Sequence, residues 1–294
     1  MANDTGIPWC DSTFNPWWGC VEVSDECARC YAREFDTRFN GEHWGKDKPR
    51  RFFGDKHWNE PRRWNKSVVA GRVGKDGRRW LVFCSSMADV FETNETLDAQ
   101  RERLWQLIRE TPALTWLMLT KRPQNIGRMV PSDLIGAPHI WYGTTVGVRS
   151  SLWRIDALIE HAWRAPVRFL SMEPLLEDVS GQPFSERLGN TPYGINWAII
   201  GSESGDGARQ MDTDWARRIV AECRTAKVSC FMKQADLDAP GISVKSGPLA
   251  ELETGRNAPY RRRDLRMGPD GIRRTHWIIE RPFIDGEQHV EWPA

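Results

Sequence analysis

The sequence lacks any long apolar run. None of its 294 residues lies in a stretch approaching the roughly 20 apolar residues that a membrane-spanning helix needs, and the mean hydropathy is −0.58. The first residues also lack the basic region followed by an apolar one that a secretory signal peptide carries. We therefore expect a soluble, cytoplasmic protein without a membrane partner.

The sequence also lacks an excess of charge of one sign, but its charges are unevenly distributed along the chain. The chain has 41 Lys and Arg against 40 Asp and Glu, so no global field drives it to nucleic acid. Residues 44–80, however, hold 12 basic and 4 acidic residues, and residues 256–274 hold 7 Arg and 2 Asp, which leaves 22 basic and 34 acidic residues elsewhere. Aromatic residues interleave the first segment: Trp44, Phe52, Phe53, Trp58, Trp64 and Trp80. Cations with flat rings suit a phosphate backbone and its bases, so both segments are candidate nucleic-acid-binding surfaces; tryptophans that pack an insertion are the alternative.

The seven cysteines are an odd number, which favours metal binding or catalysis over a disulfide framework. Cys20, Cys27 and Cys30 form a C-x6-C-x2-C pattern after the first expected strand. A [4Fe–4S] cluster held by three cysteines leaves one iron open for another ligand, whereas a structural zinc site has four protein ligands. Cys10 or His43 is available as that fourth ligand. The spacing alone leaves open a [4Fe–4S] cluster, a zinc ion and unligated thiols.

From about residue 80 the chain alternates β-rich runs with amphipathic segments, the pattern of βα units around a parallel sheet. We expect helices at 97–110, 149–162 and 212–226, the last capped by Asp212 or Thr213. The expected strands cover 7–13, 80–85, 115–120, 139–144, 167–172, 197–201 and 229–233. Most of them end in polar residues, and the carboxyl ends of parallel strands are where α/β folds place their chemistry. The sequence therefore predicts one shared site.

Seven motifs follow one another along the chain: F-N-P-W-W-G-C-x6-C-x2-C-Y-A (14–32), P-R-R-W (61–64), S-M-A-D-V-F (86–91), T-K-R-P (120–123), S-M-E-P-L (171–175), G-S-E-S-G (201–205) and F-M-K-Q (231–234). In this order they resemble the radical S-adenosylmethionine (SAM) superfamily, and most closely a phage-associated radical-SAM-like family without an assigned reaction. The resemblance spans about residues 7–234, and the interval between its first two cysteines is longer than in the commonest superfamily pattern, C-x3-C-x2-C.

This resemblance implies an α/β fold of the incomplete (β/α)6 TIM-like barrel type, with the cluster loop after the first strand. We expect the barrel over residues 1–234, with a basic insertion at 44–80, and a C-terminal extension over 235–294. It also implies a [4Fe–4S] cluster on Cys20, Cys27 and Cys30 whose open iron chelates SAM. An electron from a donor such as flavodoxin or ferredoxin then cleaves SAM to methionine and a 5′-deoxyadenosyl radical, which abstracts a hydrogen from the substrate.

The resemblance also implies roles for the polar strand ends. Ser85, Ser86 and Asp89 contact the SAM amino group and Lys121 its carboxylate, while Thr144 and Thr145 bond the ribose. The remaining expected SAM-pocket or substrate residues are Ser171, Glu173, Gly201, Glu203 and Lys233. Helix capping or buried ion pairing is the alternative for each of these groups. Tyr31 shields the cluster or contacts adenine, unless it serves packing alone.

Cys84 is a candidate catalytic residue because it directly precedes Ser85 and Ser86. In spore photoproduct lyase, the DNA-repair member of the superfamily, a cysteine at a comparable place donates hydrogen to the product radical. The alternative is a small buried core residue, since free cysteine is among the most buried residue types.

Together these features predict a radical SAM enzyme that modifies or repairs a nucleobase in DNA or RNA. One alternative is a radical SAM enzyme acting on a small nucleotide precursor or a peptide. The other is a zinc-binding or degenerate nucleic-acid-binding protein that is not an enzyme.

Overall fold

The structure, a computed structural model, describes residues 5–189, 193–204, 208–236, 242–243, 260–267, 273–280, 283–284 and 287–293. The chain forms two compact units. Unit 1 comprises Met1–Thr145 and Trp153–Phe169, and unit 2 comprises Val146–Leu152 and Leu170–Ala294. This division does not coincide with the boundary expected at residue 234, which stays a prediction.

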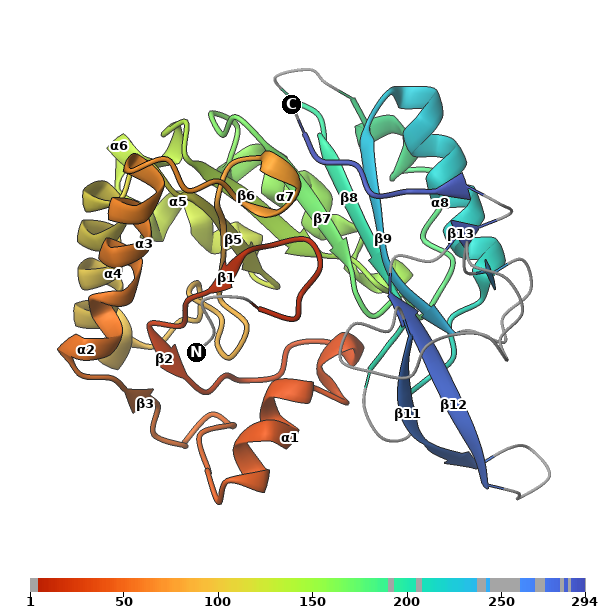
Figure 1. Cartoon of the computed structure of the whole chain (residues 1–294), viewed down its shortest axis with the longest axis horizontal. Helices are drawn as coiled ribbons and strands as arrows, with labels where there is room; N and C mark the ends of the chain where they lie inside the picture. The colour runs from red at the N-terminus through yellow and green to blue at the C-terminus, as the bar shows by residue number, and fades with distance from the viewer. Residues whose placement is uncertain are drawn as a thin grey trace. The chain divides into compact units, whose positions relative to one another are not determined.

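Seven parallel strands alternate with helices along the chain, so the fold is mixed α/β, as expected (Figure 1). The strands are β1 (Ser12–Thr13), β4 (Leu81–Cys84), β5 (Thr115–Thr120), β6 (Ile140–Thr145), β7 (Arg168–Met172), β8 (Trp197–Gly201) and β9 (Ser229–Asp236). Each lies close to its expected position, but β1 covers two residues rather than the expected 7–13. The arrangement is compatible with an incomplete TIM-like barrel, while the six-fold βα repeat stays a prediction.

Unit 1 holds four of these strands in the order β1-β4-β5-β6. Every residue of β4 and β6 is buried, as is typical of parallel strands that are covered on both faces. The helices of this unit are α1 (Tyr31–Arg38), α2 (Asp55–Trp58), α3 (Glu60–Val69), α4 (Asp98–Glu110), α5 (Ile126–Met129), α6 (Ser132–Ile135) and α7 (Trp153–His161). A two-stranded antiparallel ribbon, β2 (Trp17–Trp18) and β3 (Arg51–Phe52), lies beside α1 (Figure 1).

In unit 2, β9 pairs in parallel with β8 and antiparallel with β12 (Arg273–Glu280), which pairs with β11 (Tyr260–Met267). The unit also contains α8 (Thr213–Ala226) and the short strands β10 (Ile242–Ser243), β13 (Phe283–Ile284) and β14 (Glu287–Gln288). Asp212 caps α8 as expected, because its side chain accepts a 2.8 Å hydrogen bond from the Asp214 amide. The side chains of the basic segment 256–274 lie outside the described residues. None of the helices that the structure describes is long and apolar enough to cross a membrane.

The basic segment 44–80 differs from an irregular insertion, since it forms β3, α2 and α3. Its tryptophans Trp58, Trp64 and Trp80 are buried, so the interpretation that these rings stack on bases is wrong. Several of its cations are also occupied within the fold, through ion pairs of Arg50 with Glu92, Arg62 with Glu110 and Arg78 with Asp11. The sequence could not reveal these tertiary partners, which lie 42 to 67 residues away.

Candidate functional site

The three cysteines of the C-x6-C-x2-C pattern lie on one loop of unit 1, residues 19–30, here called the cysteine loop. Cys20 follows β2, Cys27 ends a single 3₁₀ turn (Asp25–Cys27), and Cys30 is the N-cap residue of α1. All three are partly exposed and free of disulfide bonds.

The cysteine loop starts at Gly19, which no other residue could replace without strain. Its φ is +113°, and a Cβ atom there would lie 2.3 Å from the carbonyl oxygen of His43. Arg50 fixes this neighbouring segment because its guanidinium donates to the carbonyls of His43 (3.1 Å) and Lys48 (2.6 Å) and pairs with the buried Glu92. The backbone of the loop is therefore held closely against residues 43–50.

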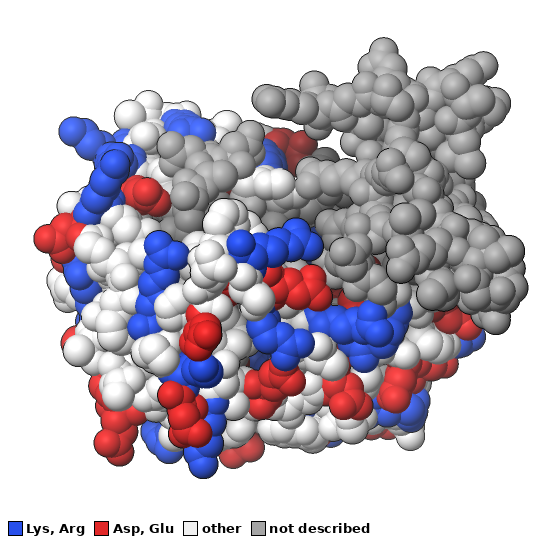
Figure 2. Space-filling model, turned by 90° about the horizontal axis from the view of Figure 1, so that it is seen from below, with Lys and Arg blue, Asp and Glu red and all other residues white. Residues whose placement is uncertain are grey.

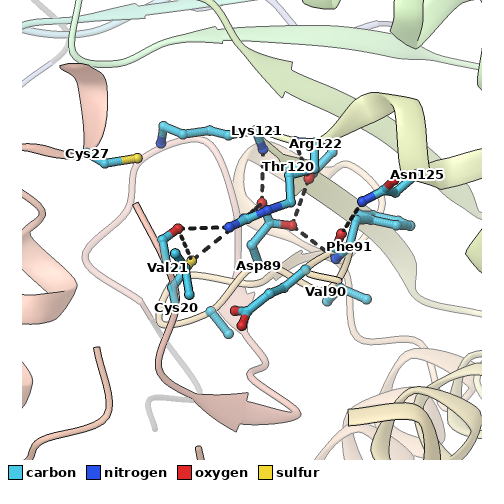
Figure 3. A network of polar contacts seen from close by, with 12 residues as sticks. Cys20, Val21, Cys27, Asp89, Val90, Phe91, Thr120, Lys121, Arg122 and Asn125 are labelled. Atoms are coloured by element: carbon cyan, nitrogen blue, oxygen red, sulfur yellow. Dashed lines mark hydrogen bonds and ion pairs between the residues drawn. The ribbon is translucent and has the colours of Figure 1, made fainter. Parts of the chain in front are cut away.

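Arg122, which follows β5, holds the first half of the cysteine loop (Figure 3). Its guanidinium donates to the Val21 carbonyl at 2.8 Å and lies 3.8 Å from the Cys20 sulfur. It also forms an ion pair with Asp89 at 2.7 Å, and both side chains are buried. The position of Arg122 follows from the T-K-R-P motif, since Pro123 excludes a helical conformation for the preceding residue and begins the next turn.

Asp89 is the centre of this network. One carboxylate oxygen accepts hydrogen bonds from the Thr120 hydroxyl (2.7 Å) and the Phe91 amide (3.0 Å), and the latter closes a local Asx turn. The other accepts from Arg122 and from the Lys121 amide (3.2 Å). The carboxylate thus makes four hydrogen bonds within the protein, which is the buried ion-pair role considered as the alternative to a SAM contact.

A second buried ion pair holds the middle of the cysteine loop. Glu26 lies 3.2 Å from Arg154 of α7, and their side chains are fully or almost fully buried. Arg154 also donates to the Thr145 carbonyl at 3.0 Å, which ties the end of β6 to the loop. Breaking such a pair leaves an uncompensated buried charge, so this contact fixes the loop strongly.

The other expected residues of unit 1 lie around these two anchors. Ser85 donates to the Ala88 carbonyl (2.8 Å), and Thr144 donates to the Thr120 carbonyl (2.8 Å), so both hydroxyls brace strand ends. Ser86 accepts a hydrogen bond at 3.1 Å from Asn15, and its carbonyl accepts another at 2.9 Å from the half-exposed Tyr31. Thr145 is buried.

Lys121 differs from its neighbours because its ammonium forms no ion pair with any residue that the structure describes. Its side chain is partly exposed and extends towards Cys27 in Figure 3. A cation beside the cysteine loop without a protein partner is suited to an anionic ligand such as a carboxylate.

The donor set of the cysteine loop fits an iron–sulfur cluster in its chemistry, since three thiols lie on one loop and cluster ligands are cysteine thiolates. Among the residues that the structure describes, no three His, Cys, Asp or Glu side chains converge closely enough to hold a metal ion. Burial and the nearby Asp89 carboxylate raise the pKa of Cys20 to about 12, while Arg122 opposes this shift. A cluster bound at Cys20 would therefore have to displace a thiol proton.

Cys84 lies in a different environment. It is completely buried at the end of β4, and burial raises the pKa of its thiol well above the ordinary value. These are the properties of the core residue that was the alternative to a hydrogen donor.

Unit 2 contains the remaining expected residues. Lys233 of β9 forms an ion pair with Glu173, and a Cβ atom at Gly201 would lie 3.3 Å from a Glu173 oxygen, so all three are brought together. Glu203 is separately occupied by Arg209, which donates to it through its amide (2.7 Å) and its guanidinium (2.5 Å). Ser171 is buried in β7.

Three residues of the unit 1 site were missed by reasoning from the sequence: Arg122, Glu26 and Arg154. The signal for Arg122 was available, because it stands in the T-K-R-P motif between Lys121 and Pro123. The sequence held no signal for Glu26 and Arg154, since they lie 128 residues apart and only the fold brings them together.

A family comparison matches residues 4–249 to the family described as Protein of unknown function (DUF5131). The comparisons with curated proteins and with solved structures gave no match. Because the family match covers most of the sequence, the chain belongs to the family described as Protein of unknown function (DUF5131).

Proposed function

We propose that this protein is a radical SAM enzyme that binds a [4Fe–4S] cluster through Cys20, Cys27 and Cys30 and modifies or repairs a nucleobase in DNA or RNA. The observation that carries the proposal is the set of three free, partly exposed thiols on one loop, which two buried arginines anchor beside the carboxyl ends of parallel strands. When bound, such a cluster supplies the electron for reductive cleavage of SAM. We propose a flavodoxin or ferredoxin as its reductant.

The residues of unit 1 would then divide the work of binding. The three cysteines hold the cluster as thiolates, and the Arg122 guanidinium beside Cys20 offsets part of their negative charge. Lys121 pairs with the SAM carboxylate, because its ammonium has no ion-pair partner in the described part of the chain. Tyr31 covers the cluster from the start of α1, where its hydroxyl is held by the Ser86 carbonyl.

The strand ends would form the walls of the SAM pocket. Ser85, Ser86, Asp89, Thr144 and Thr145 keep the positions of the unit 1 loops through their hydrogen bonds, and Asp89 acts through the arginine and lysine that follow β5. The proposed SAM or substrate residues of unit 2 are Ser171, Glu173, Gly201, Glu203 and Lys233. Cys84 stays a candidate hydrogen donor whose test is the product distribution of Cys84→Ala.

Anaerobic reconstitution of the full chain with iron and sulfide tests the cluster. We expect close to four iron and four sulfide per chain, and release of 5′-deoxyadenosine after addition of SAM and dithionite. Cys27→Ala should lose both signals. Cys223→Ala is the matched control, because that thiol is buried in α8 of unit 2 and should retain both.

Two outcomes would contradict the proposal. About one zinc and no iron per chain would favour the zinc-binding alternative. A loaded cluster that yields no 5′-deoxyadenosine would refute SAM cleavage. Cleavage without affinity for oligonucleotides would instead favour the small-nucleotide or peptide substrate.

A further inference from the structure

Exposed aromatic side chains gather on α1 and the β2–β3 ribbon of unit 1. Tyr31 and Phe35 lie on α1, and Phe39 directly follows it at the same helical spacing; they are 47%, 42% and 67% exposed. Phe52 of β3 is 46% exposed. A contiguous exposed apolar patch marks an interaction surface.

The rings of α1 connect with the ribbon into one surface. Phe35 contacts Phe39, with ring centroids 4.9 Å apart, and Trp18 of β2, 5.9 Å away. The Arg51 guanidinium lies over the Trp18 ring at 4.7 Å. Phe52 pairs with the buried Trp17, so its ring lies on the other side of the ribbon from Arg51 and Trp18. Trp18, Tyr31, Phe35, Phe39 and Arg51 are called the aromatic face below.

The composition of this region suits base stacking. Residues 31–56 contain no Leu, Ile, Val or Met, so the apolar surface that they expose consists almost entirely of rings. Rings with a stacked guanidinium are how proteins bind unpaired bases, because every base has a π-face and stacking tolerates any sequence.

Two arginines near the aromatic face are available to a bound anion. Arg51 and Arg38 have no carboxylate partner among the residues that the structure describes, so both are available to phosphates. Seen from the side on which α1, β2 and β3 lie in Figure 1, the described surface interleaves basic and acidic side chains without one broad basic field (Figure 2). Such a surface is poorly suited to a duplex, whose bases are hidden and whose phosphates dominate binding.

We propose that the aromatic face binds single-stranded nucleic acid by stacking bases on Phe35 and Phe39, with Arg51 contacting phosphate or base. This inference rests on the proposed function in one respect, that the bound strand is the substrate. The proposed contact with nucleic acid is therefore made not by the buried tryptophans of 44–80 but by rings that begin with Tyr31, directly after Cys30.

The test is binding of fluorescein-labelled 20-nucleotide single-stranded DNA and RNA of mixed sequence to the anaerobically reconstituted full chain, with the DNA duplex for comparison. We expect Phe39→Ala and Phe35→Ala each to weaken single-strand binding about tenfold. Arg51→Ala should lower the slope of log K against log salt by about one. Trp163→Ala is the matched control, since this ring is 56% exposed at the end of α7, with the Arg164 guanidinium 5.8 Å from its centroid; it should leave binding unchanged.

Absence of single-strand binding by the wild-type chain would overturn the inference. Equal losses of oligonucleotide binding in Trp163→Ala and Phe39→Ala would also overturn it. So would variants of the aromatic face that slow reduction of the cluster by flavodoxin but keep oligonucleotide binding, because they would indicate a protein-docking surface. The inference and the proposed function fail separately. Binding without release of 5′-deoxyadenosine contradicts only the enzyme. SAM cleavage by a chain that binds oligonucleotides equally well with and without Phe35 and Phe39 contradicts only the aromatic face.

Discussion

Replacing Asp89 with asparagine tests whether the Asp89–Arg122 pair holds the cysteine loop. The carboxylate accepts four hydrogen bonds, two on each oxygen. An asparagine can keep the two from Thr120 and Phe91, but its amide group then faces the Lys121 amide and the Arg122 guanidinium with donors opposite donors. The substitution therefore removes the charge partner of Arg122 while the shape of the side chain is kept.

The expected loss of stability follows from the burial of both groups. Breaking a buried ion pair from one side costs about 3–5 kcal/mol, because a charge is left without compensation. Arg122 retains the Val21 carbonyl at 2.8 Å, so we expect the lower end, about 3 kcal/mol. For a unit of this size, that loss lowers the melting temperature by about 6–12 °C.

Calorimetric melting of the cluster-free chain measures this change. Glu110→Gln is the control, because its ion pair with Arg62 is 36–39% exposed and such pairs contribute at most about 1 kcal/mol. If Asp89→Asn melts no lower than Glu110→Gln, the network does not hold the loop. The same variant should bind less iron on reconstitution, since Arg122 then no longer fixes the start of the loop.

Three further results are expected. Iodoacetamide should label Cys27 and Cys30 in the native chain, as peptide mass spectrometry would reveal. The four buried cysteines, Cys10, Cys84, Cys223 and Cys230, should be labelled only after unfolding, and their labelling in the native chain would contradict their burial. Glu26→Gln should speed the labelling of Cys27, because the loop loses its Arg154 anchor; an unchanged rate would show that this pair does not restrain the loop. Burial lowers the pKa of His57 below its ordinary 6.5, so the unfolded chain takes up a proton that the folded chain excludes, and the urea midpoint should fall as the pH drops below about 6.5. His57→Gln should flatten that dependence, and an unaltered pH profile would contradict it.

The parallel strands were predictable because their signal is local. Runs such as W-L-V-F-C-S and T-W-L-M-L-T are apolar throughout, as strands covered on both faces must be, and β4 and β5 fall within them. The length of the first strand was predicted less well. Only Ser12 and Thr13 pair with β4, although residues 7–13 had the composition of a longer strand.

In the basic segment 44–80, local composition does not reveal which side chains are buried. Its composition is that of a nucleic-acid-binding surface, but Trp58 lies in the core and packs edge-on against Phe14 at 5.3 Å. Arg50 likewise serves the fold through Glu92. The face that does expose rings uses Phe35 and Phe39, which precede this segment and are marked only by their spacing along α1.

The two anchors of the cysteine loop also explain how one loop can be fixed and still accept a ligand. Arg122 restrains it at Cys20 and Val21, and Arg154 restrains it at Glu26. Beyond Glu26, the contact that the described residues make with the Cys27 sulfur is a long one, 3.9 Å to the Ser24 hydroxyl. Cys27 can therefore turn its thiol towards a cluster without breaking either buried ion pair, while Arg33, which donates to the Ala28 carbonyl at 2.6 Å, and the N-cap position of Cys30 hold the rest of the loop. Cluster binding should accordingly protect the amides of residues 27–30 from hydrogen exchange while leaving those near Arg122 and Arg154 unchanged.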